Sequence, residues 1–173
     1  MYLISIYFDE KTNNRMQSYI KQVAKRSGNT FMTEKNVPPH LTISAFETRN
    51  ENAVCSLLEE KKETFRKGEL TWCSVGTFFP HVIYLAPVLN IYLQELSEKV
   101  YEMLRETDEI KIHGCYRPMQ WFPHTTIGKK LSKEEMLAAF RVMQEQFGMF
   151  SGLAVRIGLA RTNPYEELWE FEM

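Results

Sequence analysis

Apolar residues recur at two different spacings along the chain, and these spacings predict alternating strands and helices. The run Tyr2–Phe8, YLISIYF, is β-branched and aromatic and precedes a polar cluster at residues 9–14, so it predicts a buried strand. An amphipathic helix follows, with apolar residues at the i, i+3, i+4, i+7 spacing: Met16, Tyr19, Ile20 and Val23. Gly28 is expected to end this helix, because glycine readily adopts positive φ.

The next segment is predicted to be a loop, a strand and a helix. Residues 29–39 form the loop, and the proline pair at its end disfavours helix, so residues 40–46 are expected to be extended. Thr48 and Glu51 have the spacing of a capping box and predict a helix that ends near Gly68. Two strands, at residues 69–79 and 82–88, are then expected around a turn at Pro80 and His81.

The rest of the chain repeats this order. A helix is predicted from Asn90 to Thr107, and a loop leads to a second extended stretch that begins at His124. Ser132 and Glu135 form a capping box for another helix. Strands at residues 153–161 and 167–173 are expected to close the chain as a hairpin.

The repeated order predicts a duplicated fold. Strand, helix, His-x-Thr strand, helix and strand occur twice, and the two histidines are 84 residues apart, which is too long a period for a solenoid repeat. We therefore expect a single bilobal α+β domain over residues 1–173, made of two pseudo-twofold-related βαβαβ lobes with mostly antiparallel sheets. The lobes would comprise approximately residues 1–80 and 81–173, with strand exchange between them left open. A central cleft would carry both His-x-Thr strands.

Composition narrows the possible partners. The chain has 173 residues, 44% of them hydrophobic, which is enough to bury a core. Its 21 basic and 22 acidic residues nearly cancel, which argues against binding to a long nucleic-acid duplex. Three cysteines without CxxC spacing, no signal sequence and no apolar run long enough to span a bilayer predict a reduced, cytoplasmic protein without a membrane partner. We expect a monomer.

The candidate chemistry lies in two similar stretches, PPHLTISAF at residues 38–46 and FPHTTIGKK at residues 122–130. On a strand, His40 and Thr42 share one face, and His124 and Thr126 do the same in the second copy. Two imidazoles can supply a base and an acid near neutral pH, and two hydroxyls can donate to phosphoryl oxygens. The pattern therefore predicts phosphoryl transfer without a nucleophilic side chain or a cofactor.

Other interpretations compete with this one. A single His-x-Thr pair is usually structural, but a repeated pair, preceded by proline and followed by isoleucine at equivalent positions, favours function. A zinc site would need further ligands, and neither stretch has a cysteine or an acidic residue beside its histidine. We therefore predict no metal.

The loop KIHGCYRPMQW before the second motif holds further candidates. Tyr116 and Arg117 are possible substrate contacts, since an arginine can pair with a phosphate and an aromatic ring can stack on a base. Trp121 and Phe122 fit stacking or the core. His113 is expected to be a structural loop residue, with entry into the cleft as the alternative. His81 is interpreted more simply as a turn residue. Lys129 and Lys130 are interpreted more simply as residues that cap the end of the strand.

The chain resembles the two-histidine phosphoesterases, specifically the bacterial RNA 2′,5′-ligase-like cyclic phosphodiesterases. The resemblance rests on HLTI at residues 40–43 and HTTI at residues 124–127, and extends to FFPHVIYLAPV and IGLARTNP. It implies a bilobal fold and metal-independent hydrolysis of a 2′,3′-cyclic phosphate or a related 2′,5′-phosphodiester. It also implies that His40 and His124 are catalytic and that Thr42 and Thr126 bind the phosphate. His124 would activate the water and His40 would protonate the leaving oxygen, although the pseudo-symmetry leaves these two roles nearly interchangeable.

The expected substrate is a nucleotide cyclic phosphate or a short RNA end, which would give the protein a role in RNA processing. The sequence does not choose between hydrolysis and 2′,5′-ligation. Two other classes stay open: a non-catalytic module that binds RNA ends or nucleotides, and a hydrolase of non-nucleic phosphoesters.

Overall fold

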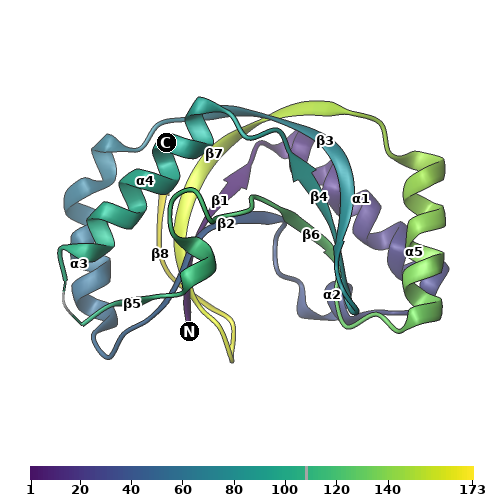
Figure 1. Cartoon of the computed structure of the whole chain (residues 1–173), viewed down its shortest axis with the longest axis horizontal. Helices are drawn as coiled ribbons and strands as arrows, with labels where there is room; N and C mark the ends of the chain where they lie inside the picture. The colour runs from purple at the N-terminus through teal and green to yellow at the C-terminus, as the bar shows by residue number, and fades with distance from the viewer. Residues whose placement is uncertain (108) are drawn as a thin grey trace.

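The computed structural model describes residues 1–107 and 109–173 (Figure 1). The strands are β1 (Tyr2–Phe8), β2 (His40–Glu47), β3 (Gly68–Phe78), β4 (Val82–Pro87), β5 (Lys111–Ile112), β6 (Thr125–Gly128), β7 (Phe150–Arg161) and β8 (Glu166–Glu172). The helices are α1 (Glu10–Ser27), α2 (Phe31–Lys35), α3 (Glu51–Lys61), α4 (Ile91–Arg105) and α5 (Lys133–Gln146), with short 3-10 turns at Lys62–Thr64 and Gly114–Tyr116. The predicted mixture of helices and antiparallel strands is confirmed.

The sheet shows the duplication in its strand order. Its order is β5-β2-β1-β7-β3-β4-β6, with β8 paired to β7, and every pairing is antiparallel. Exchanging β1 with β4, β2 with β6 and β3 with β7 reverses the order of these six strands, as a twofold relation between the halves requires. The third strand of each half thus lies beside the first strand of the other half. β5 and β8 have no counterparts and break the symmetry on the β2 side.

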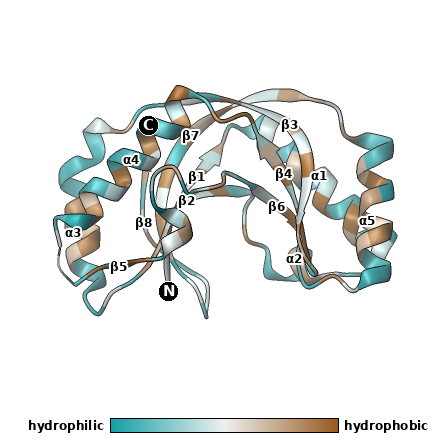
Figure 2. Ribbon diagram, in the orientation of Figure 1, coloured by the Kyte–Doolittle hydropathy of each residue, from teal (hydrophilic) through white to brown (hydrophobic). Residues whose placement is uncertain are grey.

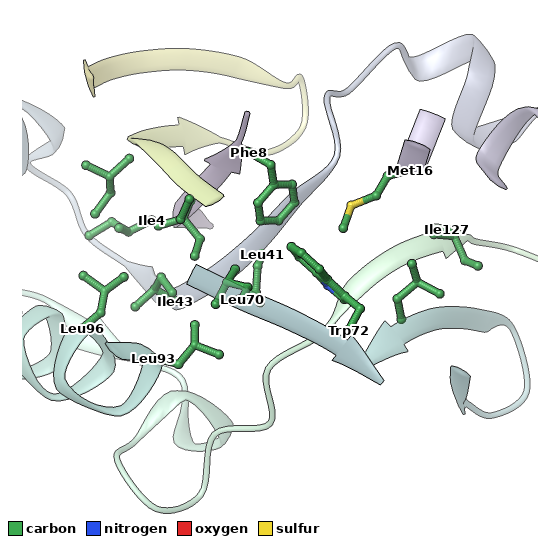
Figure 3. Packing of buried hydrophobic residues seen from close by; sticks show 14 of the residues in the cluster. Ile4, Phe8, Met16, Leu41, Ile43, Leu70, Trp72, Leu93, Leu96 and Ile127 are labelled. Carbon is green, nitrogen blue, oxygen red and sulfur yellow. The ribbon is translucent and has the colours of Figure 1, made fainter. Parts of the chain in front are cut away.

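Helices pack at both ends of an arched sheet (Figure 1). α3 and α4 lie at one end, and α1 and α5 pack together at the other. Brown hydrophobic segments face the sheet on these helices, while teal segments face outward (Figure 2). At the centre of the core, Phe8 packs edge-on against the fully buried Trp72, with ring centroids 5.0 Å apart (Figure 3).

Helix ends agree with the sequence at three caps. Gly28 ends α1 in the left-handed region, at φ 77°. The Asn90 side chain accepts from the Leu93 backbone N–H at the start of α4. Ser132 and Glu135 form the predicted capping box at the start of α5. The closing hairpin of β7 and β8 is also confirmed.

The polar cluster at residues 9–14 follows the end of β1 as predicted and begins α1, because the Asp9 carboxylate accepts from the Thr12 N–H and caps the helix. Two boundaries were predicted wrongly. The expected loop at residues 29–39 contains the short helix α2. Asn50 caps α3 in place of Thr48, and this helix ends at Lys61, so Gly68 already lies in β3.

The structure bears in part on the expectations of a reduced protein and of no membrane partner. Cys55, Cys73 and Cys115 are free thiols. Among the residues that the structure describes, no helix has the length and hydrophobicity to cross a bilayer.

Candidate active site

The two motif histidines are held in the same way. His40 opens β2, and its Nδ1 lies 2.8 Å from the carbonyl oxygen of Pro38. His124 immediately precedes β6, and its Nδ1 lies 2.9 Å from the carbonyl oxygen of Phe122. A carbonyl can only accept, so Nδ1 carries the hydrogen in both rings, and Nε2 of each neutral ring keeps a lone pair for a reactant.

The fold brings these two strands together. β2 and β6 lie at opposite ends of the strand order, yet they contact each other below the arch of the sheet (Figure 1). Burial lowers the pKa of His124, and burial also lowers the pKa of His40, with the positive charges of His124 and Lys129 acting in the same direction. Both rings therefore favour the neutral form.

The threonines differ more than the histidines. Thr42 is buried, its Oγ1 lies 3.4 Å from the Ser5 Oγ, and its carbonyl accepts from the Trp121 Nε1–H at 3.1 Å. Thr126 is half-buried and lies opposite Tyr84 in the pairing of β6 with β4. The predicted alternation holds in the second motif, because Ile127 is fully buried between Thr126 and Gly128.

Charged and polar groups surround His40. Tyr7 of β1 is its register partner, with ring centroids 6.1 Å apart. Arg156 of β7 is in turn opposite Tyr7, and its guanidinium carbon lies 3.9 Å from the centroid of that phenol ring. Glu167 contacts Arg156, and its charge raises the pKa of His40 against the effect of burial.

Aromatic rings surround His124 instead. Phe78 meets the imidazole edge-on at 4.7 Å between centroids, and Tyr84 lies 5.5 Å away. Phe122 lies 5.7 Å from Tyr84 and 6.2 Å from Phe78. Phe78 and Phe122 are 41% and 51% exposed, so this aromatic wall, formed by Phe78, Tyr84 and Phe122, offers free ring surface beside the histidine.

The candidate residues of the loop before β6 differ in how close they lie to the two motifs. Burial raises the pKa of Tyr116 to about 12, and Thr42 acts against that shift, so Tyr116 lies near the first motif. Arg117 is exposed, and no contact in the described part of the chain joins its side chain to either motif. Trp121 is half-buried and holds Thr42 through its indole N–H, whereas Phe122 is exposed and does not belong to the core.

The remaining histidines lie elsewhere. His113 Nε2 is 3.9 Å from a carboxylate oxygen of Glu47, at the end of β2 opposite His40, so the suggestion that it enters the site is wrong. His81 is exposed at the β3–β4 turn, as predicted, with Nδ1 2.8 Å from the Leu131 carbonyl oxygen. Lys129 directly follows β6, and its charge lowers the pKa of His40.

Sequence reasoning missed Tyr7, Phe78, Tyr84, Arg156 and Glu167. Their places depend on which strands pair and in which register, and no local spacing encodes that. Tyr7 gave the one available signal, as a polar-tipped aromatic at the end of an otherwise apolar strand.

A cavity of about 370 Å³ adjoins the His40 side, lined in part by Tyr7, Pro38 and Arg156. A smaller one, of about 90 Å³, is lined in part by Met119 and Trp121 of the loop before β6. Within residues 1–107 and 109–173, no three or more His, Cys, Asp or Glu side chains gather as a metal site would require.

Comparison with known proteins identifies a family and a fold. The family model of the 2′-5′ RNA ligase superfamily matches residues 15–165. Among solved structures, E. coli LigT complexed with NADP+ has 18% identity and a TM-score of 0.53, covering 99% of this chain and 96% of that chain. E. coli LigT complexed with 3′-AMP has 15% identity and a TM-score of 0.56, covering 99% and 97%. At these identities the structural likeness shows the fold alone. No curated protein matches the sequence.

Proposed function

The chain belongs to the 2′-5′ RNA ligase superfamily, and we propose that it hydrolyses a 2′,3′-cyclic phosphate, or a related 2′,5′-phosphodiester, of a nucleotide or RNA end. The observation that carries the proposal is the matched pair of histidines. Each ring donates Nδ1–H to the carbonyl of the residue two positions earlier, which leaves both Nε2 atoms for chemistry. The family match confirms the resemblance that the two motifs suggested.

The proposed reaction needs one base and one acid. Neutral His124 takes a proton from water at Nε2, and the water oxygen forms a bond to phosphorus. The bond from phosphorus to the ribose 2′ oxygen breaks, and protonated His40 gives its Nε2 proton to that oxygen. One proton enters the pair and one leaves, so a 3′-phosphate and a free 2′-hydroxyl form without a metal or cofactor.

The threonines complete this proposal. Hydroxyls of Thr42 and Thr126 would donate to the non-bridging oxygens, where negative charge grows in the transition state. Thr126 is half-buried and open to a ligand, while Thr42 is held at its carbonyl by Trp121. This restraint would keep the first hydroxyl in place, which is what a donor of this kind requires.

The aromatic wall at His124 supports a nucleotide substrate. Exposed aromatic rings bind bases by stacking, and here they lie beside a histidine that we propose to be catalytic. The E. coli LigT structures with NADP+ and 3′-AMP show that a protein of this fold binds nucleotides. We propose a short or monomeric nucleotide ligand, with the protein acting as a cytoplasmic monomer in RNA processing.

A product assay tests this function. The wild-type protein is incubated with each of the four nucleoside 2′,3′-cyclic phosphates in EDTA, and the products are separated as 2′- and 3′-phosphates. We expect turnover to the 3′-phosphate. Binding without turnover would identify a nucleotide-binding module, and turnover confined to aryl phosphodiesters would identify a hydrolase of non-nucleic esters.

Ligation needs a separate arm of the same assay. A 5′-hydroxyl oligonucleotide is added to an RNA that ends in a 2′,3′-cyclic phosphate, and the mixture is examined for a longer product. Joining without hydrolysis would contradict the proposed direction.

A further inference from the structure

The small cavity beside Trp121 lies between α4 and the loop before β6. Its lining includes Gln94, Ser97 and Glu98 of α4 and Met119 and Trp121 of the loop. Its volume of about 90 Å³ corresponds to about three water molecules, at about 30 Å³ each in the liquid. A cavity of this size can hold the edge of an aromatic ring with one substituent, but it cannot enclose a whole nucleoside.

Ser97 gives this cavity a polar group that the protein leaves without a partner. Its side chain is only 4% exposed, and its Oγ forms no hydrogen bond within residues 1–107 and 109–173. A buried hydroxyl without a partner costs stability, and most buried hydroxyls in proteins are therefore hydrogen-bonded. Because Ser97 lines the cavity, a ligand bound there would restore the missing hydrogen bond.

Two further side chains of α4 present hydrogen-bond acceptors to the same cavity. Gln94, Ser97 and Glu98 have the i, i+3, i+4 spacing and so share one face of the helix. The Gln94 amide Nε2–H donates to Glu98 Oε1 at 3.2 Å, so the other carboxylate oxygen and the Gln94 carbonyl oxygen can accept from a ligand. No ion pair joins Glu98 to a residue that the structure describes. The cavity therefore favours a ligand that donates.

The loop side of the cavity is apolar. The Trp121 indole N–H already donates to the Thr42 carbonyl, so Trp121 offers the cavity its ring and no free donor. Met119 is 86% exposed and has a φ of 64°, which is uncommon for a residue other than glycine. Leu89, before α4, adds a second exposed apolar side chain. A flat ring and an adaptable thioether suit a planar ligand.

We propose that this cavity binds the amino-bearing edge of a second nucleobase, that of the nucleotide next to the one that carries the reacting phosphate. The exocyclic amine of cytosine or adenine would donate to Glu98, as carboxylates accept from cytosine in other proteins. Ser97 would pair with the neighbouring ring nitrogen. Uracil and hypoxanthine have a carbonyl in place of this amine, and a carbonyl cannot donate to the carboxylate.

The position of the loop supports a second base rather than the first. Trp121 lines the cavity and binds the Thr42 carbonyl, whereas the next residue, Phe122, belongs to the aromatic wall beside His124. The loop thus has one base site on each side, close to the first motif. The inference rests on the proposed function, because that function makes the ligand an RNA end.

The first test follows the indole N–H signal of Trp121 by NMR. The chain has three tryptophans, and the spectrum of Trp121→Phe assigns this signal. Cytidine with uridine, and adenosine with inosine, are matched pairs that exchange an amine for a carbonyl. Cytidine and adenosine should shift the signal saturably and bind about five-fold or more tighter than uridine and inosine, because one hydrogen bond to a charged group is lost.

Variants of α4 show whether this cavity is the site. Glu98→Gln should remove the preference for cytidine over uridine. Ser97→Ala should weaken cytidine binding about three-fold or more without lowering the melting temperature, because its hydroxyl has no protein partner to lose. Glu95→Gln is the matched control, since Glu95 is an exposed glutamate of the same helix that lines a different cavity, and it should bind like wild type.

A kinetic arm extends the test to substrates. Two dinucleotides, CA and UA, each end in a 2′,3′-cyclic phosphate, and kcat/KM should be about five-fold or more higher for CA in wild type and equal in Glu98→Gln. Equal binding of cytidine and uridine, a preference that survives in Glu98→Gln, or no Trp121 shift with any nucleoside overturns the inference. A saturable Trp121 shift without turnover of either dinucleotide would instead overturn the proposed function, because binding does not depend on cleavage.

Discussion

The two motif strands have nearly the same backbone but different neighbours. Each histidine is held by the carbonyl of the residue two positions earlier. His40 faces Tyr7, with Arg156 and Glu167 behind it, whereas His124 is surrounded by Phe78, Tyr84 and Phe122. Duplication of the fold supplies two equivalent imidazoles, and their neighbours on β1, β7 and the unduplicated β8 make their surroundings unequal. An acid and a base need this inequality, because two identical rings would compete for one proton.

The largest effect is expected from removing either histidine. His40→Ala and His124→Ala should each lower kcat/KM by at least about 10²-fold, the usual contribution of one acid or base. Steady-state kinetics on a nucleoside 2′,3′-cyclic phosphate measure this. His113→Ala is the matched control, since that exposed side chain lies near Glu47, and its activity should be unchanged. If either motif variant keeps more than about a tenth of the activity, the paired mechanism is wrong.

Valine variants of the two motif threonines should both lower kcat but should differ in their effect on the free energy of unfolding. Thr126→Val and Thr42→Val should each lower kcat by about 10-fold to 10³-fold. Thr42→Val should also lower the free energy of unfolding by about 1 kcal/mol, because its buried hydroxyl lies beside Ser5, whereas Thr126 is half-buried. Kinetics and urea unfolding measure the two effects. A change confined to KM would make the threonines ground-state binders.

For the threonine pair, the neighbouring Thr125→Val serves as a control. Its side chain is fully buried and accepts from the Trp72 indole N–H, on the other side of the strand. It should lose stability but keep kcat within about two-fold, because its hydroxyl cannot reach the phosphate face.

The aromatic wall should act on binding. Phe122→Ala removes one exposed ring and should raise KM for nucleoside cyclic phosphates about five-fold or more, since stacking contributes about 1 to 3 kcal/mol per base. Ethylene glycol cyclic phosphate, which has no base, should show no change in KM. Phe140→Ala, a partly exposed phenylalanine of α5, is the control variant. An equal loss on both substrates would remove base stacking from the account.

The smallest effect is expected at Trp121. Trp121→Phe removes the hydrogen bond to the Thr42 carbonyl and should cost about 1 kcal/mol of stability, with a few-fold decrease in kcat. Trp169→Phe is the control, because that indole N–H binds Glu59 on the surface. If both variants have the same kcat, Trp121 has no part in holding the first motif.

Much of this fold follows from local sequence, and much of the site does not. Gly28, Asn90 and the Ser132–Glu135 box marked helix ends correctly because caps are local hydrogen bonds. Thr48 was misinterpreted as the cap of α3 because it has capping-box spacing to Glu51, whereas the Asn50 side chain makes the cap. The two histidines were found because the duplication repeats their motif. Tyr7, Arg156 and Phe78 were not, since register across distant strands places them.

The most direct test of the central claim is the pH dependence of kcat/KM with a nucleoside 2′,3′-cyclic phosphate in EDTA. A base that must be neutral and an acid that must be protonated predict a bell. Burial lowers the pKa of both His40 and His124, so the bell should be centred at or below histidine's usual value of about 6.5. EDTA should leave it unchanged. A rate that rises to a plateau above about pH 8, or that EDTA abolishes and zinc or manganese restores, would indicate a metal-bound hydroxide and contradict the account.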